Sequence, residues 1–452
     1  MTQFDLSEIR SKLTEQIRFF DSAGKKIWRA SISLPDIDIL NWLNAIDLHP
    51  KFFWSDRLGQ NSFATAGTVY KVSGNQWSGY TSPFSEIEKI LQNSHPELRF
   101  FGGLRFNPSL NGAPEWKNFG KYQFFVPAFE LLKTPRKTLL SYNYLADEQK
   151  ERHEDLINSL LNTRDSGDRF LPKSDPVHWE ERSDLPQLQD WQVMVDCSLD
   201  FLDRGVFKKI VLARKSKFQF KNEPNAFTLF RQLRDTYSNS FFFFFQLNHD
   251  LTFMGVSPEL LYIRQGNKIF TEALAGTRPR GKDDAEDLKL ELELKNDGKE
   301  QREHRWVSRE IEHNLNESCS EWTRLTNEEV IKWAFVQHLQ TKFEGILKET
   351  ATDGQILKIF HPTPAVAGLP RESALKQIEL LEKFDRGWYA GPIGWLSKEK
   401  AEFAVALRSA LLCKKEALVY GGAGIVKGSE PLKEWQEIEN KLMNFTNLFN
   451  GR

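Results

Sequence analysis

Hydrophobic residues recur along this chain with two different periods, which separate predicted helices from predicted strands. A period near 3.6 residues predicts helices, whereas alternation or short apolar runs predict strands. We predict helices at 5–17, 148–161, 188–204 and 374–384, and two further helices that carry Glu300 and Glu434. We predict strands at 26–34, 61–72, 99–106, 121–132, 209–220, 240–248, 251–256, 260–264, 268–273, 391–396, 402–413 and 417–420. Hairpin-spaced strands interrupted by long helices indicate an α+β fold, with antiparallel sheets covered by helices.

The composition indicates an extensive folded interior and gives no sign of a charged or membrane partner. Aromatic residues make up 13% of the 452 residues, which argues against disorder. The formal net charge of −1 provides no electrostatic reason to bind nucleic acid or an anionic membrane. No apolar run approaches the ~18 residues of a membrane helix, and the run Phe241–Phe245 is typical of a buried strand.

The cysteines and the N-terminal residues favour the cytoplasm. Cys197, Cys319 and Cys413 are scattered and form no metal-binding or disulfide pattern, as expected in a reducing compartment. The opening residues MTQFDLSEIR are polar and acidic, unlike a signal peptide. We therefore expect a cytoplasmic protein.

Two pairs of glutamates, Glu300/Glu303 and Glu434/Glu437, lie on predicted helices beside the apolar stripe and are expected to point inward. A helix normally carries acids opposite its apolar face, because an unpaired buried carboxylate is very costly. Convergent carboxylates therefore indicate a cation. With no cysteine nearby and His304 as the one adjacent imidazole, the oxygen ligands favour Mg²⁺ over zinc.

Two other interpretations of these glutamates stay open at this point. The chain has 62 acidic residues, so glutamates three apart arise by chance. Asp297 and Glu300 also resemble a helix-capping pattern, in which Glu300 would fold back onto the backbone.

Four further segments could carry chemistry. One is the segment 272–281, whose small residues allow close backbone approach, although a structural turn explains Gly276 equally well. Lys209 begins an apolar strand, where a lysine either extends to the sheet edge or, when desolvated, acts as a base. Glu259 follows Ser257-Pro in a turn; it is either solvated or, if enclosed by apolar groups, keeps its proton and acts as a general acid. The glycine-rich segment 421–427 fits neither nucleotide-binding pattern. We interpret it as a turn whose N–H groups could hold a carboxylate.

The order of motifs resembles that of the chorismate-utilising enzymes. The segments KIVLAR, SPELL, EALAGTRPRG, KEQREH, QHLQT, HPTPAVAG, YAGPIGW, VALR, GGAGIV and EWQEIENKL follow one another across about residues 195–445. A weaker resemblance extends over residues 50–130 through FFWSD, FFGGLRFNP and FVPAFELL. It implies one domain over 1–452, with a weaker-matching half at 1–185 and a motif-dense half at 186–452, although length alone suggests about three. The implied fold is a single large α/β sandwich of two packed antiparallel sheets with helices outside.

The resemblance also implies roles for individual residues. Lys209 matches the base that activates water, and Glu259 matches the acid that protonates the departing 4-hydroxyl. Glu303 and Glu437 match Mg²⁺ ligands, supported by Glu300 and Glu434. The matched substrate-binding positions are Gly276, Thr277, His338, Ala365, Tyr389, Arg408, Gly422, Ala423, Gly424 and Lys441.

Within this family the chain is most similar to the isochorismate synthases. Ala275 stands where aminodeoxychorismate synthases carry a lysine nucleophile, and Ala365 where salicylate and anthranilate synthases usually carry threonine. The implied reaction is a reversible, Mg²⁺-dependent conversion of chorismate to isochorismate, in which water adds at C2 and the C4 hydroxyl leaves. A salicylate or anthranilate synthase is the nearest alternative, and a non-catalytic binding subunit is another.

The resemblance leaves the pathway open between menaquinone and a siderophore. It implies a small-molecule substrate, chorismate, and a monomer without an obligate protein partner.

Overall fold

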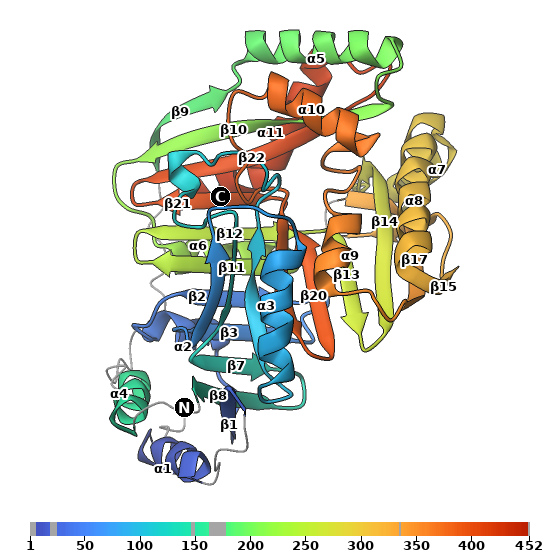
Figure 1. The fold of residues 1–452 in the computed structure, drawn as a ribbon. Helices are drawn as coiled ribbons and strands as arrows, with labels where there is room; N and C mark the ends of the chain where they lie inside the picture. Colours follow the sequence, from blue (N-terminus) through green and yellow to red (C-terminus); the bar gives the residue numbers. More distant parts are fainter. Residues whose placement is uncertain (1–5, 19–24, 146–149, 162–177, 334–335, 451–452) are drawn as a thin grey trace.

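The computed structural model describes residues 6–18, 25–145, 150–161, 178–333 and 336–450. Two large sheets dominate these residues, and helices cover their outer sides (Figure 1). Every pair of neighbouring strands in these residues is antiparallel. The predicted α+β fold with two packed antiparallel sheets is thereby confirmed.

The first sheet has 12 strands in the order β1-β8-β7-β3-β2-β11-β12-β21-β22-β10-β18, with β9 paired to β10. Their bounds are β1 (Ile27–Leu34), β2 (Lys51–Ser55), β3 (Ser62–Ala66), β7 (Phe129–Lys133), β8 (Thr138–Leu145), β9 (Trp179–Leu185), β10 (Lys209–Phe220), β11 (Phe241–Asn248), β12 (Leu251–Ser257), β18 (Gly368–Leu369), β21 (Ser409–Cys413) and β22 (Glu416–Ile425).

The second sheet has 10 strands in the order β15-β17-β14-β13-β20-β19-β5-β6-β4, with β16 paired to β17. Their bounds are β4 (Tyr70–Gly74), β5 (Arg99–Leu104), β6 (Tyr122–Val126), β13 (Leu260–Gln265), β14 (Lys268–Pro279), β15 (Cys319–Arg324), β16 (Glu329–Lys332), β17 (Val336–Leu347), β19 (Pro392–Ser397) and β20 (Lys400–Val405).

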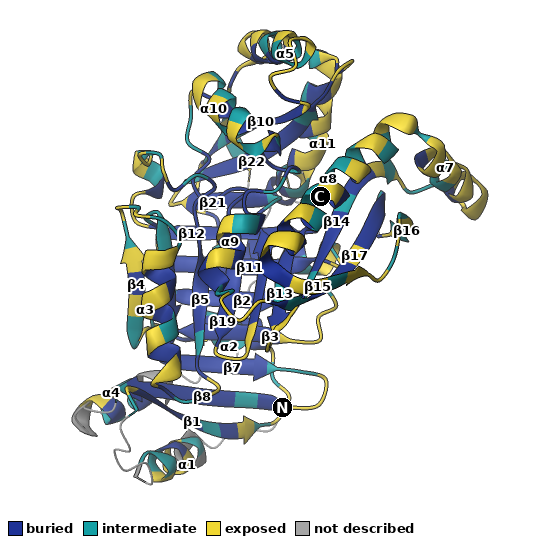
Figure 2. Ribbon diagram, turned by 45° about the vertical axis from the view of Figure 1, so that its right-hand side comes forward, coloured by how far each residue is buried: buried dark blue, intermediate teal, exposed yellow. Residues whose placement is uncertain are grey.

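The helices expose one side to solvent, whereas most strands are buried (Figure 2). Among them, α8 packs on β14 and β17, and α11 packs on β22 and α5. The helix bounds are α1 (Leu6–Arg18), α2 (Ile39–Ala45), α3 (Thr81–Gln92), α4 (Lys150–Leu161), α5 (Leu188–Asp203), α6 (Ala226–Thr236), α7 (Asp284–Asn296), α8 (Gly298–Ser318), α9 (Asp353–Phe360), α10 (Arg371–Leu381) and α11 (Pro431–Phe449).

Aromatic side chains fill the space between the two sheets. Phe52 of the first sheet lies with its ring centroid 5.6 Å from Phe101 of the second, and Phe125 stacks on Phe245 at 5.6 Å. Such offset and edge contacts add to the stabilisation from burying apolar area. The phenylalanine run Phe241–Phe245 forms β11 and is buried, as its sequence predicts.

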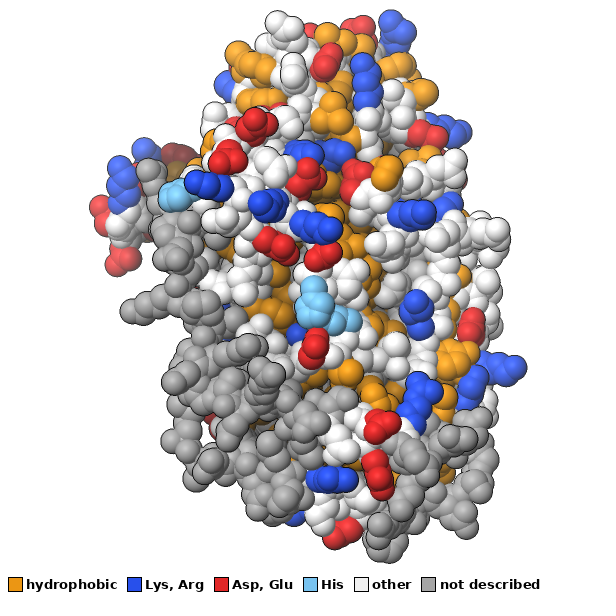
Figure 3. Space-filling model, turned by 90° about the vertical axis from the view of Figure 1, so that its left-hand side faces the viewer, with side chains coloured by type: hydrophobic (Ala, Val, Ile, Leu, Met, Phe, Trp, Pro, Cys, Tyr) orange, Lys and Arg blue, Asp and Glu red, His pale blue; other side chains and the backbone are white. Residues whose placement is uncertain are grey.

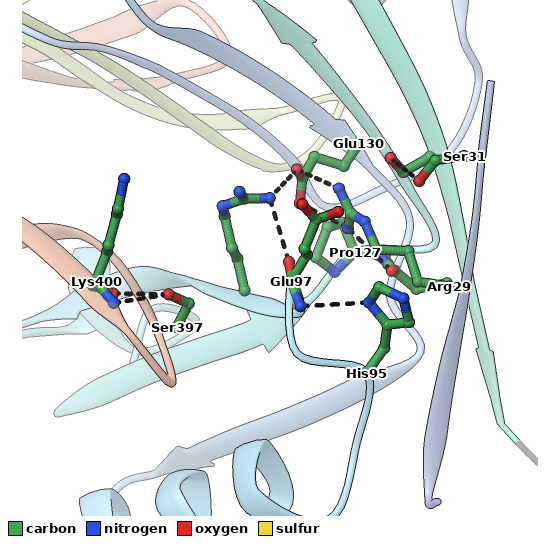
Figure 4. Close-up of polar contacts among 11 residues, drawn as sticks. Arg29, Ser31, His95, Glu97, Pro127, Glu130, Ser397 and Lys400 are labelled. Atoms are coloured by element: carbon green, nitrogen blue, oxygen red, sulfur yellow. Dashed lines mark hydrogen bonds and ion pairs between the residues drawn. The ribbon is translucent and has the colours of Figure 1, made fainter. Parts of the chain in front are cut away.

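A buried charge network also joins the sheets (Figure 4). Arg29 of β1 donates to Glu130 Oε1 at 2.6 Å, and Arg99 of β5 donates to the same oxygen at 2.7 Å. Burial raises the pKa of Glu130, but the two guanidinium groups outweigh burial and hold it below its usual value. Because buried charges need partners, this network fixes β1 and β5 to β7.

Several predicted elements divide where the chain passes between sheets. The predicted strand 402–413 is β20 in the second sheet and β21 in the first, because the chain turns at Arg408 with a φ of 44°. The strand predicted at 121–132 likewise divides into β6 and β7. Between the predicted strand 268–273 and the predicted helix of Glu300 lies α7, for which we predict no helix because its leucines follow no clear stripe.

The glycine run expected as a turn belongs to a strand. Gly421–Gly424 lie within β22 and pair with β10, Gly424 standing opposite Val211. Glycine is unfavourable in a strand interior and usually marks a close approach of another group. In this strand it makes room for the side chains of Tyr389 and Lys209.

No helix in the described ranges is both long enough and apolar enough to cross a membrane.

Replacing Phe52 with alanine should destabilise the fold. Phe52 is fully buried and touches aromatic rings from both sheets, so we expect a loss of about 3–5 kcal/mol in the free energy of unfolding. Urea denaturation followed by circular dichroism measures it. Leu58→Ala, at a position 70% exposed, is the control and should change this free energy by less than about 0.5 kcal/mol.

Candidate active site

Lys209 is buried at the start of β10 and forms an ion pair. Its Nζ donates to Glu303 Oε1 of α8 at 2.5 Å, and the lysine side chain is 3% exposed. Gly424 makes room for it, because a Cβ at that position would lie 2.9 Å from Lys209 Cε. The alternative in which this lysine extends to a solvated sheet edge is therefore wrong.

Glu259 lies between β12 and β13 and is also buried, with 8% exposure. Thr363 Oγ1 donates to its Oε1 at 2.9 Å. Burial raises the pKa of Glu259 to about 7, against the opposing effects of Thr363 and Lys209. The carboxyl group thus holds its proton up to near-neutral pH, as expected for a glutamate enclosed by apolar groups. The alternative in which Glu259 is a solvated turn residue is wrong.

The first glutamate pair lies in the first two turns of α8, with Glu300 in the first turn. Asp297 caps this helix by accepting from the backbone N–H groups of Lys299 at 2.8 Å and Glu300 at 3.2 Å. The carboxylate of Glu300 is not directed to the cap: it accepts from Arg278 at 2.9 Å and from the N–H of Thr277 at 3.3 Å. The capping alternative thus holds for Asp297 but not for the side chain of Glu300.

Of the second pair of glutamates, on α11, only Glu434 points inward. Glu434 is buried, but the side chain of Glu437 is 50% exposed and accepts from Lys441, one turn later, at 2.7 Å. The expectation that both pairs point inward is wrong for Glu437. Ile438 and Leu442 occupy the face of α11 that packs on the sheet, which leaves Glu437 on the shoulder of the helix.

The carboxylates of α8 and α11 share one electrostatic environment. Burial raises the pKa of Glu300 and of Glu434, and the neighbouring Glu303 and Glu437 raise them further. Burial also raises the pKa of Glu303, but Lys209 and Lys441 outweigh it and lower the pKa below its usual value. All of these donors are carboxylate oxygens, the kind of ligand that a hard divalent cation prefers. Among the described residues, no three of these glutamates bring carboxylate oxygens within 4.8 Å of one another.

β14 and β17 contribute three of the expected substrate-binding residues. Thr277 and His338 are paired across these strands, with Thr277 Oγ1 2.9 Å from His338 Nδ1. Gly276 has a φ of 81°, a left-handed backbone conformation that favours glycine. A Cβ added at this position would lie 3.3 Å from Glu300 Oε2. Burial, and then Arg408, lower the pKa of His338 to about 3. Its Nε2 is buried and has no hydrogen-bond partner among the described residues.

Strand β22 of the first sheet, helix α11 and the connections that carry Tyr389 and Arg408 contribute further expected residues. Tyr389 Oη would lie 3.1 Å from a Cβ at Gly422, and Lys441 donates to the carbonyl of Gly422 at 2.9 Å. Burial raises the pKa of the Tyr389 phenol, so it remains a hydrogen-bond donor at neutral pH. Burial lowers the pKa of Arg408. After burial, the charges of Arg408 and Lys441 contribute to the lowered pKa of His338.

Two expected residues stand apart from this group. Ala423 lies between Gly422 and Gly424 in β22, so its side chain points to the opposite face of the sheet. Ala365 is half-buried and follows Thr363, the residue that contacts Glu259, by two positions.

The structure also places residues that the sequence did not single out. Thr363 contacts Glu259, Arg278 contacts Glu300, and Arg57 pairs with Glu272 beside Glu259. Thr363, Arg278 and Glu272 lie inside the motifs HPTPAVAG and EALAGTRPRG. Their position within those motifs was the one available signal, whereas their contacts depend on the pairing of strands.

A second group of metal-binding side chains lies elsewhere. Asp47, His49 and His249 have ligand atoms within 4.8 Å of one another, and histidine and acidic side chains adjoin on the face drawn in Figure 3. The side chains of Asp47 and His249 are 84% and 74% exposed and are 3.2 Å apart. Because water competes strongly for such exposed groups, we interpret this group as a contact between two surface loops.

Comparison with known proteins agrees with this arrangement of residues. The family model described as chorismate binding enzyme matches residues 14–450. The chain belongs to the chorismate-binding enzyme family. It is 31% identical to isochorismate synthase MenF of Haemophilus influenzae, over 98% of this chain and 97% of that protein. It is 32% identical to the chloroplastic isochorismate synthase of Catharanthus roseus, over 94% of this chain and 81% of that protein.

A solved structure shows the same fold over nearly the whole length. The menaquinone-specific isochorismate synthase of Escherichia coli superposes with a TM-score of 0.85 at 27% identity. The match covers 98% of this chain and 99% of that one.

Replacing Gly424 with alanine should displace Lys209 without unfolding the protein. The added Cβ would lie 2.9 Å from Lys209 Cε, the far end of a flexible side chain, and Gly424 has no left-handed φ. We expect a melting temperature close to that of the wild type and a turnover of the enzyme reduced by about 10²-fold, as small misplacements of reacting groups cause. A crystal structure of the variant measures the shift, and an unmoved Lys209 would contradict the prediction.

Proposed function

We propose that this chain is an isochorismate synthase that converts chorismate reversibly to isochorismate. The observation that supports it best is the placement of two opposite proton-transfer groups at one site: Lys209, paired with Glu303, and Glu259, whose pKa is raised to about 7. A hydroxyl transposition needs a base and an acid that act on different atoms of one ring.

In the proposed mechanism, Lys209 first leaves its ion pair with Glu303 and gives up its ammonium proton to solvent. The neutral amine then takes a proton from a water molecule whose oxygen bonds to C2 of chorismate. The ring double bond shifts, and the C4–O bond breaks. Glu259 supplies its proton to the leaving oxygen, so one water is consumed and one is released. The buried position of Glu259 supports this role, because an exposed glutamate would have lost its proton at neutral pH.

The substrate is a dianion that must settle among carboxylates. We propose that Glu303 and Glu437, supported by Glu300 and Glu434, would hold Mg²⁺, which when bound neutralises the glutamates and attracts a substrate carboxylate. Arg408 and Tyr389 would hold a carboxylate, Arg408 by a charge-assisted hydrogen bond. Gly276, Thr277, His338, Gly422, Gly424 and Lys441 would surround the ring.

The nearest alternatives differ in the nucleophile and in the fate of the product. Ala275 provides no side-chain amine for attack on C2, which supports water as the nucleophile. Ala365, in place of threonine, supports release of isochorismate without pyruvate elimination.

We also propose a single domain that acts as a monomer in the cytoplasm. One cluster of buried hydrophobic residues extends from Leu13 to Phe449 and draws on both halves of the chain, which supports the single domain. Unpaired Cys197, Cys319 and Cys413 support a reducing compartment. Menaquinone supply is the pathway that the similarity to the Escherichia coli enzyme favours.

Chromatography of products from purified protein, chorismate and Mg²⁺ tests this function. We expect isochorismate; salicylate with pyruvate, or anthranilate with pyruvate when ammonia is added, would replace the proposal by the corresponding alternative. Binding of chorismate without any product would favour a non-catalytic subunit. Lys209→Ala and Glu259→Gln should each lower kcat by about 10²–10⁴, the usual range for general acid–base groups.

Removal of the divalent ion should abolish turnover. After dialysis against EDTA we expect no isochorismate, and addition of Mg²⁺ should restore it, because the glutamates then no longer repel the substrate dianion. Glu303→Gln should raise the Mg²⁺ concentration needed for half-maximal rate at least about 10-fold. Full turnover in the presence of EDTA would contradict the metal role.

A further inference from the structure

Arg57 connects two segments beside Glu259. It lies in the turn between β2 and β3, and its Nη2 donates to the carbonyl of Pro258, the residue before Glu259, at 2.7 Å. Its guanidinium also contacts both carboxylate oxygens of Glu272 on β14, with Nη1 2.9 Å from Oε2. The two side chains are 16% and 3% exposed, so this bidentate pair is largely removed from water.

Neighbouring groups hold the pair in place. The guanidinium carbon of Arg57 lies 5.0 Å from the ring centroid of Phe241 and 5.7 Å from that of Trp333. Gln340 of β17 donates to Glu272 Oε2 at 2.7 Å. A planar guanidinium that is both bidentate and flanked by rings has little freedom to move. The turn that carries Glu259 is therefore tied to a fixed group on the second sheet.

Charges of both signs surround Glu259. Lys209 and Arg57 lower its pKa, and Glu272 raises it. Burial raises the pKa of the Tyr389 phenol, and the charges of Glu382 and Glu259 raise it further. Arg57 and Glu272 thus act on Glu259 in opposite directions, and the loss of either one leaves an unbalanced charge beside the proposed acid.

We propose that Arg57 and Glu272 are positioning residues for the proton donor: their ion pair holds the 257–259 turn and balances the charge beside Glu259. The inference rests on the proposed function of Glu259 as general acid. The hydrogen bond to Pro258 sets where the carboxyl group lies, and the balance of the two charges decides whether it is protonated at the working pH.

The test uses variants that unbalance the pair in opposite directions. The alkaline limb of kcat/KM reports loss of the acid proton in the free enzyme. Glu272→Gln leaves the Arg57 cation and should move this limb to lower pH by about one unit. Arg57→Met leaves the Glu272 anion and should move the limb to higher pH. The double variant removes both charges, a change that buried pairs usually tolerate, and should return the limb to within about 0.3 units of wild type.

Two further variants separate positioning from charge and from stability. Arg57→Lys keeps the cation but loses the bidentate fork, so kcat should fall about 10-fold while the limb stays in place. Arg99→Met is the matched control, because Arg99 is also 16% exposed and also pairs with a buried glutamate, Glu130. It should lower stability and leave the limb unmoved.

A second measurement is independent of turnover. The ¹³C carboxyl shift of Glu259, assigned as the resonance missing from Glu259→Gln, reports its titration directly in the full chain. Failure of the proposed function would appear as wild-type protein that makes no isochorismate, whatever this titration shows. The inference is overturned if Glu272→Gln and Arg57→Met leave the titration of Glu259 unchanged or move it in the same direction. It is also overturned if Arg99→Met moves it equally.

Discussion

The contact between Lys209 and Glu303 is the interaction on which the site depends. Lys209 begins β10 in the first sheet, whereas Glu303 lies on α8, which packs on the second sheet. The pair therefore exists only when the two sheets and their helices are assembled. Burial would penalise each charge alone, so the lysine and the carboxylate are each tolerated at this position because the other is present. Removing one partner would leave the other as an uncompensated buried charge.

The same assembly explains why two carboxyl groups at one site behave differently. Glu259 is enclosed and has a pKa raised to about 7, whereas Glu303, beside Lys209 and Lys441, has a pKa held below its usual value. One can then donate a proton while the other remains an anion and a candidate ligand. Environment rather than residue type separates the roles, as in other enzymes with paired carboxyl groups.

The Arg57–Glu272 pair provides a further environment effect on Glu259, although the pair lies outside the groups proposed to react. It places no new group in the reaction, but it ties the turn of Glu259 to β14 and opposes charge with charge. An apolar pair could also fill this volume, so stability alone does not explain two buried ions. Control over the position and protonation of a neighbouring acid gives a physical reason for their presence.

The amino-acid order by itself determined the fold class and the positions of most strands. Strand β10 runs over the predicted residues, and the stripes of α8 and α11 are buried as their period requires. The order of motifs, through the family resemblance, drew attention to Lys209, Glu259 and Glu303; in the structure Lys209 contacts Glu303, and Glu259 is buried. Tertiary structure alone decided the rest: β22 uses its glycines as strand residues because Lys209 needs their space, Glu437 is half exposed, and Arg57 meets Glu272 across 215 positions of sequence. Contacts of this kind depend on which strands become neighbours in the sheets. The local period of hydrophobic residues does not determine this pairing.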